Sequence, residues 1–226
     1  MKNIDGQLLK QMIISGTNNL YNHYPEVDSL NVFPVPDGDT GMNMNLTMSS
    51  GMKEIQNRND NDVFTIAVAF SKGLLMGARG NSGVITSQIF RGFAQSLEGK
   101  KVMNSLDLAE ALVNGSEVAY KAVIRPVEGT ILTVIRESSK AMLAHVDHDT
   151  SIEKAFAFLL TEANASLQRT PELLPILKEV GVVDSGGFGL VTIFEGMEKA
   201  ILGDVIEKSQ ATVFEERLPQ PEFKGE

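Results

Sequence analysis

Hydrophobic residues recur along most of the chain at spacings of three and four positions, the period of an amphipathic helix. The first such segment covers residues 4 to 24. It is expected to end before Pro25, because the residue that precedes a proline avoids helical geometry. Residues 63 to 75 are apolar on most sides, as in a buried helix. No run of alternating apolar and polar residues indicates a β-strand.

Cap and turn residues divide the rest of the chain into further helices. Thr40, Ser105 and Thr150 are the expected N-caps of three of them. Pro171 fits the first turn of a short helix, and Gly203 fits the stop after the last one. The remaining helices are expected over residues 40–55, 84–93, 105–123, 131–145, 150–167 and 188–201, with the short one beginning at 171.

About eight helices joined by short connections predict antiparallel neighbours, and therefore an all-α bundle or helical barrel. Residues 1–203 are expected to form one domain. Residues 204–226 are polar and contain Pro219 and Pro221. They are interpreted as a linker or tail toward further domains.

The composition is that of a globular protein. Of the 226 residues, 42% are hydrophobic and 22% are charged, which allows a substantial core. The net charge of -9 and the pI near 4.9 disfavour a nucleic-acid-binding surface. The lack of cysteine excludes a thiolate metal site and a cysteine nucleophile. Without a signal peptide or an apolar run of roughly 20 residues, a cytoplasmic location without membrane insertion is expected.

The clearest candidate chemistry lies between Asn31 and Asn43, in the stretch Asn-Val-Phe-Pro-Val-Pro-Asp-Gly-Asp-Thr-Gly-Met-Asn. Asp37 and Asp39 flank Gly38, and a turn can direct both carboxylates toward one ion. A hard divalent cation prefers such oxygen ligands, although the stretch does not continue the EF-hand calcium pattern. A solvated loop or a helix cap explains an Asp-x-Asp pair equally well.

Two further glycine-rich junctions precede helices, Gly80-Asn-Ser-Gly83 and Asp184-Ser-Gly-Gly187. Glycine lets backbone N–H groups approach a ligand, and a helix N-terminus favours an anion. If antiparallel packing brings all three junctions to one end, metal-binding carboxylates would lie beside phosphate-binding N–H groups. That arrangement suits a nucleotide–magnesium complex. Each junction alone is also explained as an ordinary turn, and the P-loop pattern is absent.

Four motifs together resemble the N-terminal, nucleotide-binding domain of bacterial fatty acid kinase, which is similar to the L-type domain of dihydroxyacetone kinases. The motifs cover residues 31–44, 73–84, 121–132 and 181–187, and the similarity extends from about residue 4 to 203. The resemblance implies a barrel of eight antiparallel amphipathic helices that binds ATP and two magnesium ions at one end. It also implies a separate fatty-acid-binding protein, which presents the carboxylate that becomes an acyl phosphate.

By this resemblance, Asp37 and Asp39 are the catalytic magnesium ligands. The dihydroxyacetone kinase pattern has a third aspartate where this chain has Val32, so Asn31 is the expected substitute, with Asp28 as the alternative. The nucleoside is expected near Thr130, Leu132, Asp184 and Gly186, and the phosphates near Asn43 and the second junction. The full set of expected nucleotide-binding residues is Thr40, Asn43, Arg79, Gly80, Asn81, Ser82, Gly83, Thr130, Leu132, Asp184 and Gly186.

Three functions remain as alternatives. The first is the ATP–magnesium domain of a fatty acid kinase, which would be weak or inactive without its partner and C-terminal domains. A homodimer formed through those C-terminal domains is one alternative for the oligomeric state. Thr40 favours this branch, because the dihydroxyacetone branch carries histidine there. The second is the nucleotide-binding subunit of a dihydroxyacetone (glycerone) kinase. The third is a non-enzymatic helical interaction module, in which the glycine-rich junctions are only turns and Arg79 is only a surface residue.

Overall fold

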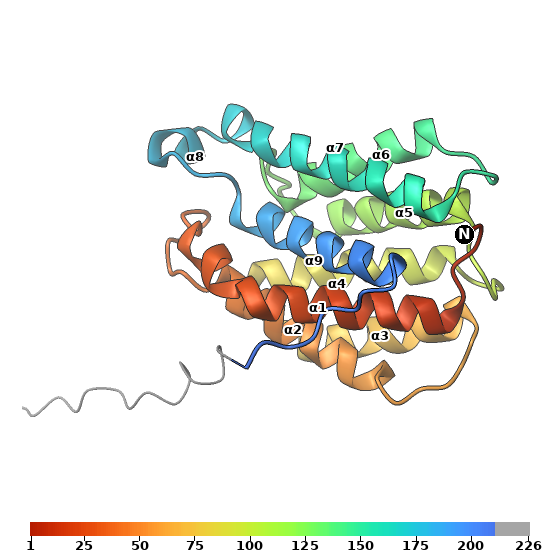
Figure 1. Cartoon of the computed structure of the whole chain (residues 1–226). Helices are drawn as coiled ribbons and strands as arrows, with labels where there is room; N and C mark the ends of the chain where they lie inside the picture. Colours follow the sequence, from red (N-terminus) through yellow and green to blue (C-terminus); the bar gives the residue numbers. More distant parts are fainter. Residues whose placement is uncertain (211–226) are drawn as a thin grey trace, which may run out of the picture.

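Nine α-helices make up residues 1–210, the part of the chain that the computed structural model describes (Figure 1). Within these residues the only β-type pairing is an isolated bridge between Ile4 and Met103. The all-α prediction is therefore confirmed. The helices are α1 Gly6–Ser29, α2 Thr40–Ile55, α3 Val63–Gly77, α4 Gly80–Ser96, α5 Ser105–Ala122, α6 Ile131–His145, α7 Ile152–Leu173, α8 Pro175–Val180 and α9 Ser185–Ile201.

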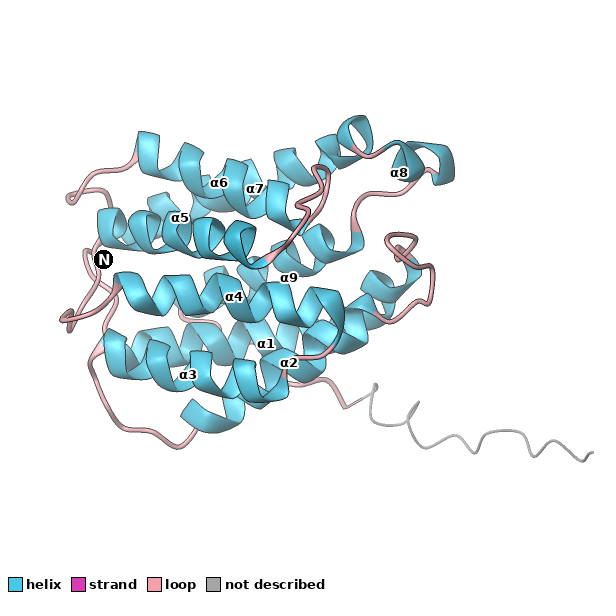
Figure 2. Cartoon of the chain, turned by 180° about the vertical axis from the view of Figure 1, so that it is seen from behind, coloured by secondary structure: helices cyan, strands magenta, loops and turns pink. Residues whose placement is uncertain are grey.

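The eight long helices form a closed ring. Each helix from α1 to α7 packs against the next one in sequence, and α9 closes the ring by packing between α7 and α1. Seen from behind, the helices lie side by side and most of the connections gather at the two ends (Figure 2). This is the helical barrel that the sequence predicted, and the six-residue α8 lies outside the ring.

Helix α9 is enclosed on nearly all sides, with thirteen of its seventeen residues buried. Its backbone touches that of α1, because a Cβ on Gly196 would lie only 2.5 Å from the Ser15 carbonyl oxygen. Phe194 meets Phe156 of α7 edge to face, with ring centroids 6.0 Å apart. Burying each such side chain stabilises the fold by about 1.5–3 kcal/mol. Although this core is apolar, no helix in residues 1–210 has the length and apolar character needed to cross a membrane.

The two ends of the barrel are built differently. At one end the N-terminal residues tie loops together through backbone hydrogen bonds: Gly6 N donates to Asn61 O (2.8 Å), and Ile152 N donates to Met1 O (2.9 Å). The amino terminus lies there, opposite α8 (Figure 1). At the other end lie the first residues of α2, α4, α6 and α9, which are the regions that the sequence marked as glycine-rich or cap-forming.

Two helices continue through a proline that was expected to bound them. Helix α1 passes Pro25 and ends at Ser29, and α7 passes Pro171 and ends at Leu173. A proline removes one backbone hydrogen bond. In α1 the final turn is nevertheless fixed, because Val27 is fully buried and Asp28 accepts hydrogen bonds from the start of α2. Tertiary contacts therefore outweigh the local preference.

Three N-caps differ from the prediction by one residue. The short helix α8 begins with Pro175 at its first position, so the proline rule applies there and not at Pro171. In α5 and α7 the neighbouring residue has the side chain that caps the helix, and the sequence alone does not choose between neighbours. In α2 the Asp39 side chain makes no cap, and Asn31 Oδ1 accepts from Thr40 N instead. The N-caps are Asp39, Asn104 and Ser151 where Thr40, Ser105 and Thr150 were expected.

The segment after α9 returns along α1. Gly203 has a φ of 86° and ends the helix region as predicted. Ile206 N then donates to Ser15 Oγ (2.9 Å), and Ser209 N donates to Asn22 Oδ1 (2.7 Å). Residues 204–210 are thus bound to α1 (blue in Figure 1). The rest of the predicted linker or tail, residues 211–226, lies outside the described residues, so the domain division stays a prediction.

Candidate functional site

The first turns of α2, α4 and α9 are joined by hydrogen bonds at the end of the barrel opposite the amino terminus. Ser82 Oγ donates to the Thr40 carbonyl oxygen, and Ser185 Oγ donates to Thr40 Oγ1, both at 3.3 Å. Thr40 therefore connects the second and third glycine-rich junctions to the first. These contacts bring the three junctions together, as the sequence predicted.

Asp184 adds the start of α6 to this group. Its buried carboxylate accepts a hydrogen bond from Gly187 N at 2.8 Å and another from Ile131 N. One side chain thus caps α9, on which it lies, and also the neighbouring helix α6. Four helix N-termini are consequently held together, each with a partial positive charge of roughly half an electron.

The beginning of α4 is the best placed of the four to receive an anion. Arg79, at the N-cap position, makes no side-chain cap, and its exposed side chain lies at the edge of the junction. The first N–H groups of a helix have no acceptor within the helix. Gly80 has a φ of 64°, and Asn81 and Ser82 follow it, so these N–H groups are available to oxygen atoms of a ligand.

Two side chains fix the loop that carries the aspartates. Asn31 is buried; its Oδ1 accepts from Asp39 N (3.1 Å) and Thr40 N (3.3 Å), and its Nδ2 donates to Val35 O (3.2 Å). Asp28 Oδ1 accepts from the next two backbone N–H groups, Gly41 N (2.7 Å) and Met42 N (3.1 Å). Both side chains therefore order the loop and the start of α2. The role of Asn31, or Asp28, as a metal ligand stays a prediction.

The two carboxylates of the loop lie beside each other and reach the second junction. Asp37 is exposed, Asp39 is partly exposed, and a hydrogen bond with Asp37 is the main cause that raises the pKa of Asp39. Asn43 also hydrogen bonds to Asp39. The Asn43 side chain covers Gly80 so closely that a Cβ there would overlap Nδ2. The carboxylates and the start of α4 thus share one surface.

Thr47 supports this surface from below, although the sequence reasoning missed it. Its Oγ1 accepts from Arg79 N (3.1 Å), donates to Asn43 O (2.8 Å), and fills the place of a Cβ on Gly83. Its position one helical turn after Asn43 was the available signal. Ser185, within the Asp-Ser-Gly-Gly motif, was missed in the same way.

The expected nucleoside residues are less open. Thr130 is the N-cap of α6, accepts from Leu132 N (3.3 Å) and is 9% exposed. Leu132 is 2% exposed and belongs to the core, so the structure does not place it on the shared surface. Gly186 lies against Ile131, where an added Cβ would be 3.3 Å from the Ile131 Cβ. The residues expected around the nucleoside are therefore closely packed, and they leave little room for a nucleotide base.

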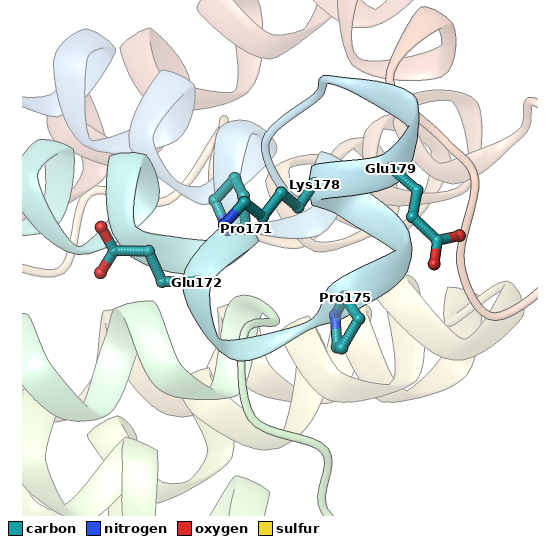
Figure 3. Close-up of a pocket in the computed structure, with 5 residues that line it drawn as sticks. All are labelled: Pro171, Glu172, Pro175, Lys178 and Glu179. Carbon is teal, nitrogen blue, oxygen red and sulfur yellow. The ribbon is translucent and has the colours of Figure 1, made fainter.

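A hollow of ≈ 400 Å³ lies outside this site, at the junction of α7 and α8. Its lining includes none of the predicted site residues, and Glu172 and Glu179 point away from each other on opposite sides of it (Figure 3). Lys178 is its one basic residue. The hollow has neither paired carboxylates nor the start of a long helix, so it offers little to a metal–phosphate group.

Burial raises the pKa of Asp184 to about 6, although the bonds from Gly187 and Ile131 oppose the change. A raised folded-state pKa means that the stability contribution is present below the ordinary value near 3.8 and is lost as pH rises through about 6. At about 1.4 kcal/mol per unit of pKa, this amounts to about 3 kcal/mol. Asp184→Asn keeps an acceptor but does not titrate. Urea unfolding from pH 4.5 to 7.5 should therefore show wild type losing stability relative to the variant; a pH-independent difference would contradict the raised pKa.

Comparison with known proteins identifies relatives. The family model described as the DAK2 domain matches residues 34–199. Protein YloV of Bacillus subtilis is 52% identical over 206 residues, covering 91% of this chain and 37% of that protein. A Staphylococcus saprophyticus protein is 51% identical over 219 residues, covering 97% of this chain and 40% of that protein. The chain thus spans about two fifths of the length of these relatives.

Solved structures share the fold at low sequence identity. The dihydroxyacetone kinase from C. freundii, crystallised with AMP-PNP and Mg2+, superposes with a TM-score of 0.65 and 19% identity. The superposition covers 86% of this chain and 34% of that one. The native form of the same enzyme gives a TM-score of 0.63 at 21% identity, with the same coverage.

Proposed function

The chain belongs to the DAK2 domain family, and from that premise we propose that it is the nucleotide-binding domain of a kinase. The proposed substrate is MgATP, and the proposed acceptor is the carboxylate of a fatty acid that a separate lipid-binding protein presents. The γ-phosphoryl group would pass to a carboxylate oxygen, which gives an acyl phosphate and ADP.

The observation that carries the proposal is the meeting of paired carboxylates with four helix N-termini. Thr40 joins α2 to α4 and α9, Asp184 joins α9 to α6, and Asn43 lies between Asp39 and Gly80. An anion is stabilised by the N–H groups, and a cation by the carboxylates. A magnesium–triphosphate complex contains both charges side by side.

The donor set fits magnesium that arrives with a nucleotide. Mg2+ commonly binds one or two protein carboxylates and takes its other ligands from phosphates and water. Asp37 and Asp39 supply two such carboxylates. Among residues 1–210, no three side chains of the His, Cys, Asp or Glu type form a group that could hold an ion. The ion would therefore bind weakly without the triphosphate.

The chain's own residues would position the phosphates of ATP and neutralise their negative charge, which is the main task of the protein in phosphoryl transfer. Bound Mg2+ would supply positive charge at the phosphate oxygens. Asp37 and Asp39 would hold that ion beside the start of α4. The N–H groups of Gly80, Asn81 and Ser82 would orient the terminal phosphates, and Arg79 would add charge at the edge. Asn31 and Asp28 would keep the carboxylate loop in register with α2.

Dihydroxyacetone is the alternative acceptor, because the chain shares its fold with a dihydroxyacetone kinase. In that case the same surface would hold a nucleotide, but the acceptor would be dihydroxyacetone on another subunit. Two assays separate the proposals: ATP consumption with a fatty-acid-loaded lipid-binding protein, and ATP consumption with a dihydroxyacetone-binding subunit. Weak turnover is expected in the first assay, because the chain spans about two fifths of its relatives and the C-terminal domains are expected to contribute. Turnover in the second assay alone would overturn the proposed acceptor.

Thermal unfolding tests the nucleotide site itself. ATP at 1 mM with Mg2+ should raise the Tm, because a ligand that binds only the folded state stabilises it. Excess EDTA should remove the increase, and Mg2+ alone should give little. Adenosine at the same concentration is the control for the base and sugar. An unchanged Tm with millimolar MgATP would favour the non-enzymatic interaction module.

A further inference from the structure

The loop between α5 and α6 is fastened by a network of charged and hydroxyl side chains that the proposed site does not use. Arg136 Nη1 donates to Glu128 Oε1 (2.5 Å) and to the Tyr120 hydroxyl (2.7 Å). Thr133 Oγ1 donates to Glu128 Oε2 (2.5 Å), so both carboxylate oxygens are engaged. We call Tyr120, Glu128, Thr133 and Arg136 the Glu128 clamp. It joins the end of α5, the loop and the first two turns of α6.

The clamp differs from an isolated ion pair because four side chains are joined in one hydrogen-bond network around Glu128. Its arginine and glutamate side chains are 31% and 43% exposed, and the guanidinium of Arg136 lies 5.3 Å from the centre of the Tyr120 ring. Burial alone would raise the pKa of Glu128, but hydrogen bonds from Arg136 and Thr133 outweigh it and lower that pKa. Glu128 is therefore ionised at neutral pH, and hydrogen bonds to charged groups are the stronger ones.

The clamp fixes Gly129, the residue before the N-cap of α6. Gly129 N donates to Thr133 Oγ1 at 2.8 Å, which is the same hydroxyl that donates to Glu128. Gly129 has a φ of 84° and leaves no room for a side chain, since a Cβ would lie 2.7 Å from the Cβ of Leu174. The loop is thus held between the clamp and the end of α7.

A second contact connects the loop at Gly129 to the candidate site through Thr170 and Asp184. A Cβ on Gly129 would also lie 2.8 Å from the Thr170 carbonyl oxygen, and Thr170 Oγ1 accepts from Asp184 N at 3.1 Å. Asp184 in turn caps both α6 and α9. The clamp therefore acts on the α6 N-terminus directly through Gly129 and Thr130, and on the α9 N-terminus through Thr170 and Asp184.

We propose that Glu128 and Arg136 are positioning residues for nucleotide binding, which rests on the proposed function. They lie outside the surface formed by Asp37, Asp39 and the start of α4, and they act by holding the α6 N-terminus where it meets α9. Without the clamp the loop would sample other arrangements, and the apparent affinity would fall with the fraction of molecules that remain competent.

The test compares Arg136→Met with a matched control on the same helix. Glu137, the next residue of α6, pairs with Arg169 of α7 at 3.3 Å, and the exposed fractions are similar (32% and 44%), but this pair does not touch the loop. Glu137→Gln is therefore the control. Calorimetric titration with MgATP at 15 °C measures affinity, and amide hydrogen exchange of residues 128–132 measures the order of the loop.

Arg136→Met and Glu128→Gln should each weaken MgATP binding about tenfold, if about a tenth of the molecules stay competent. Exchange over residues 128–132 should accelerate while α1 and α5 stay protected. Glu137→Gln should change neither. Arg136→Lys should recover most of the affinity, because one nitrogen of Arg136 makes both contacts. The Arg136→Met, Glu128→Gln double variant should bind no more weakly than the weaker single variant.

Two results would overturn the proposal, and they are distinguishable. If Arg136→Met and Glu128→Gln lower the Tm but bind MgATP like wild type, the clamp only stabilises the fold. If wild type itself does not bind MgATP, the proposed function fails and the clamp has no nucleotide to position. Should Arg136→Met not fold, Glu128→Gln and Arg136→Lys carry the same comparison, with unchanged affinity in Glu128→Gln overturning the inference.

Discussion

Replacing Asp37 and Asp39 together with asparagine is expected to abolish magnesium-dependent ATP binding while the barrel stays folded. Neither carboxylate is buried, and the hydrogen bond between them raises the pKa of Asp39. Removing both charges should therefore cost the ligand-free protein little folding stability. Loss of both ligands should weaken MgATP binding by about 100-fold or more, since even outer-shell changes at metal sites cost 10–100-fold. Calorimetry and circular dichroism measure the two effects.

The chain contains a matched control for this variant. Asp147 and Asp149 form a second Asp-x-Asp pair in a turn between α6 and α7, at the end of the barrel that the N-terminal residues close. Asp147→Asn with Asp149→Asn makes the same change of charge away from the site. It should leave MgATP affinity unchanged. Equal loss of affinity in both double variants would show that net charge, and not ligation, is responsible.

Replacing Gly41 with alanine is expected to cause the largest loss of stability near the site. A Cβ there would overlap the Tyr24 carbonyl oxygen and lie 2.8 Å from the Val27 Cβ and 3.0 Å from Asp28 Oδ1. Overpacking against backbone costs about 1–3 kcal/mol and occasionally more. A loss of about 3 kcal/mol corresponds to a Tm lower by roughly 6–12 °C for a domain of this size.

The Gly41→Ala effect should extend to binding, because α2 would move away from α1 and loosen the cap that Asp28 provides. Gly99→Ala is the control: Gly99 has a φ of 78° but nothing lies within 4 Å of an added Cβ. It should cost about 1 kcal/mol through backbone strain and leave MgATP affinity intact. A Gly41→Ala protein as stable as Gly99→Ala would contradict the tight crossing of α1 and α2.

The sequence predicted that the three glycine-rich junctions could meet at one end of the barrel, and the contacts of Thr40 with Ser82 and Ser185 agree with that; their role in binding a ligand stays a prediction. Glycines before helices and the Asp37–Asp39 pair are short-range signals, and antiparallel packing then determines that alternate helix ends lie together. The same logic predicted the barrel. Local signals do not show which of these residues are buried. Leu132 was predicted beside the nucleoside, but it lies in the core.

Long-range contacts account for what the sequence did not reveal. Pro25 is a strong local stop signal, and only the packing of Val27 and the cap from Asp28 explain why α1 continues. Thr47 and Thr170 each look like ordinary helix residues, yet each accepts a backbone hydrogen bond from a junction 32 or 14 residues away. No periodicity or composition identifies such partners.

A crystal structure with AMP-PNP and Mn2+ in place of Mg2+ tests the central claim most directly, because anomalous scattering locates the metal. The expected result is a manganese peak bridging Asp37, Asp39 and the phosphates, with phosphate oxygens at the N–H groups of Gly80 to Ser82. A nucleotide bound elsewhere, for example in the hollow between α7 and α8, or a metal without contact to either aspartate, would contradict the account.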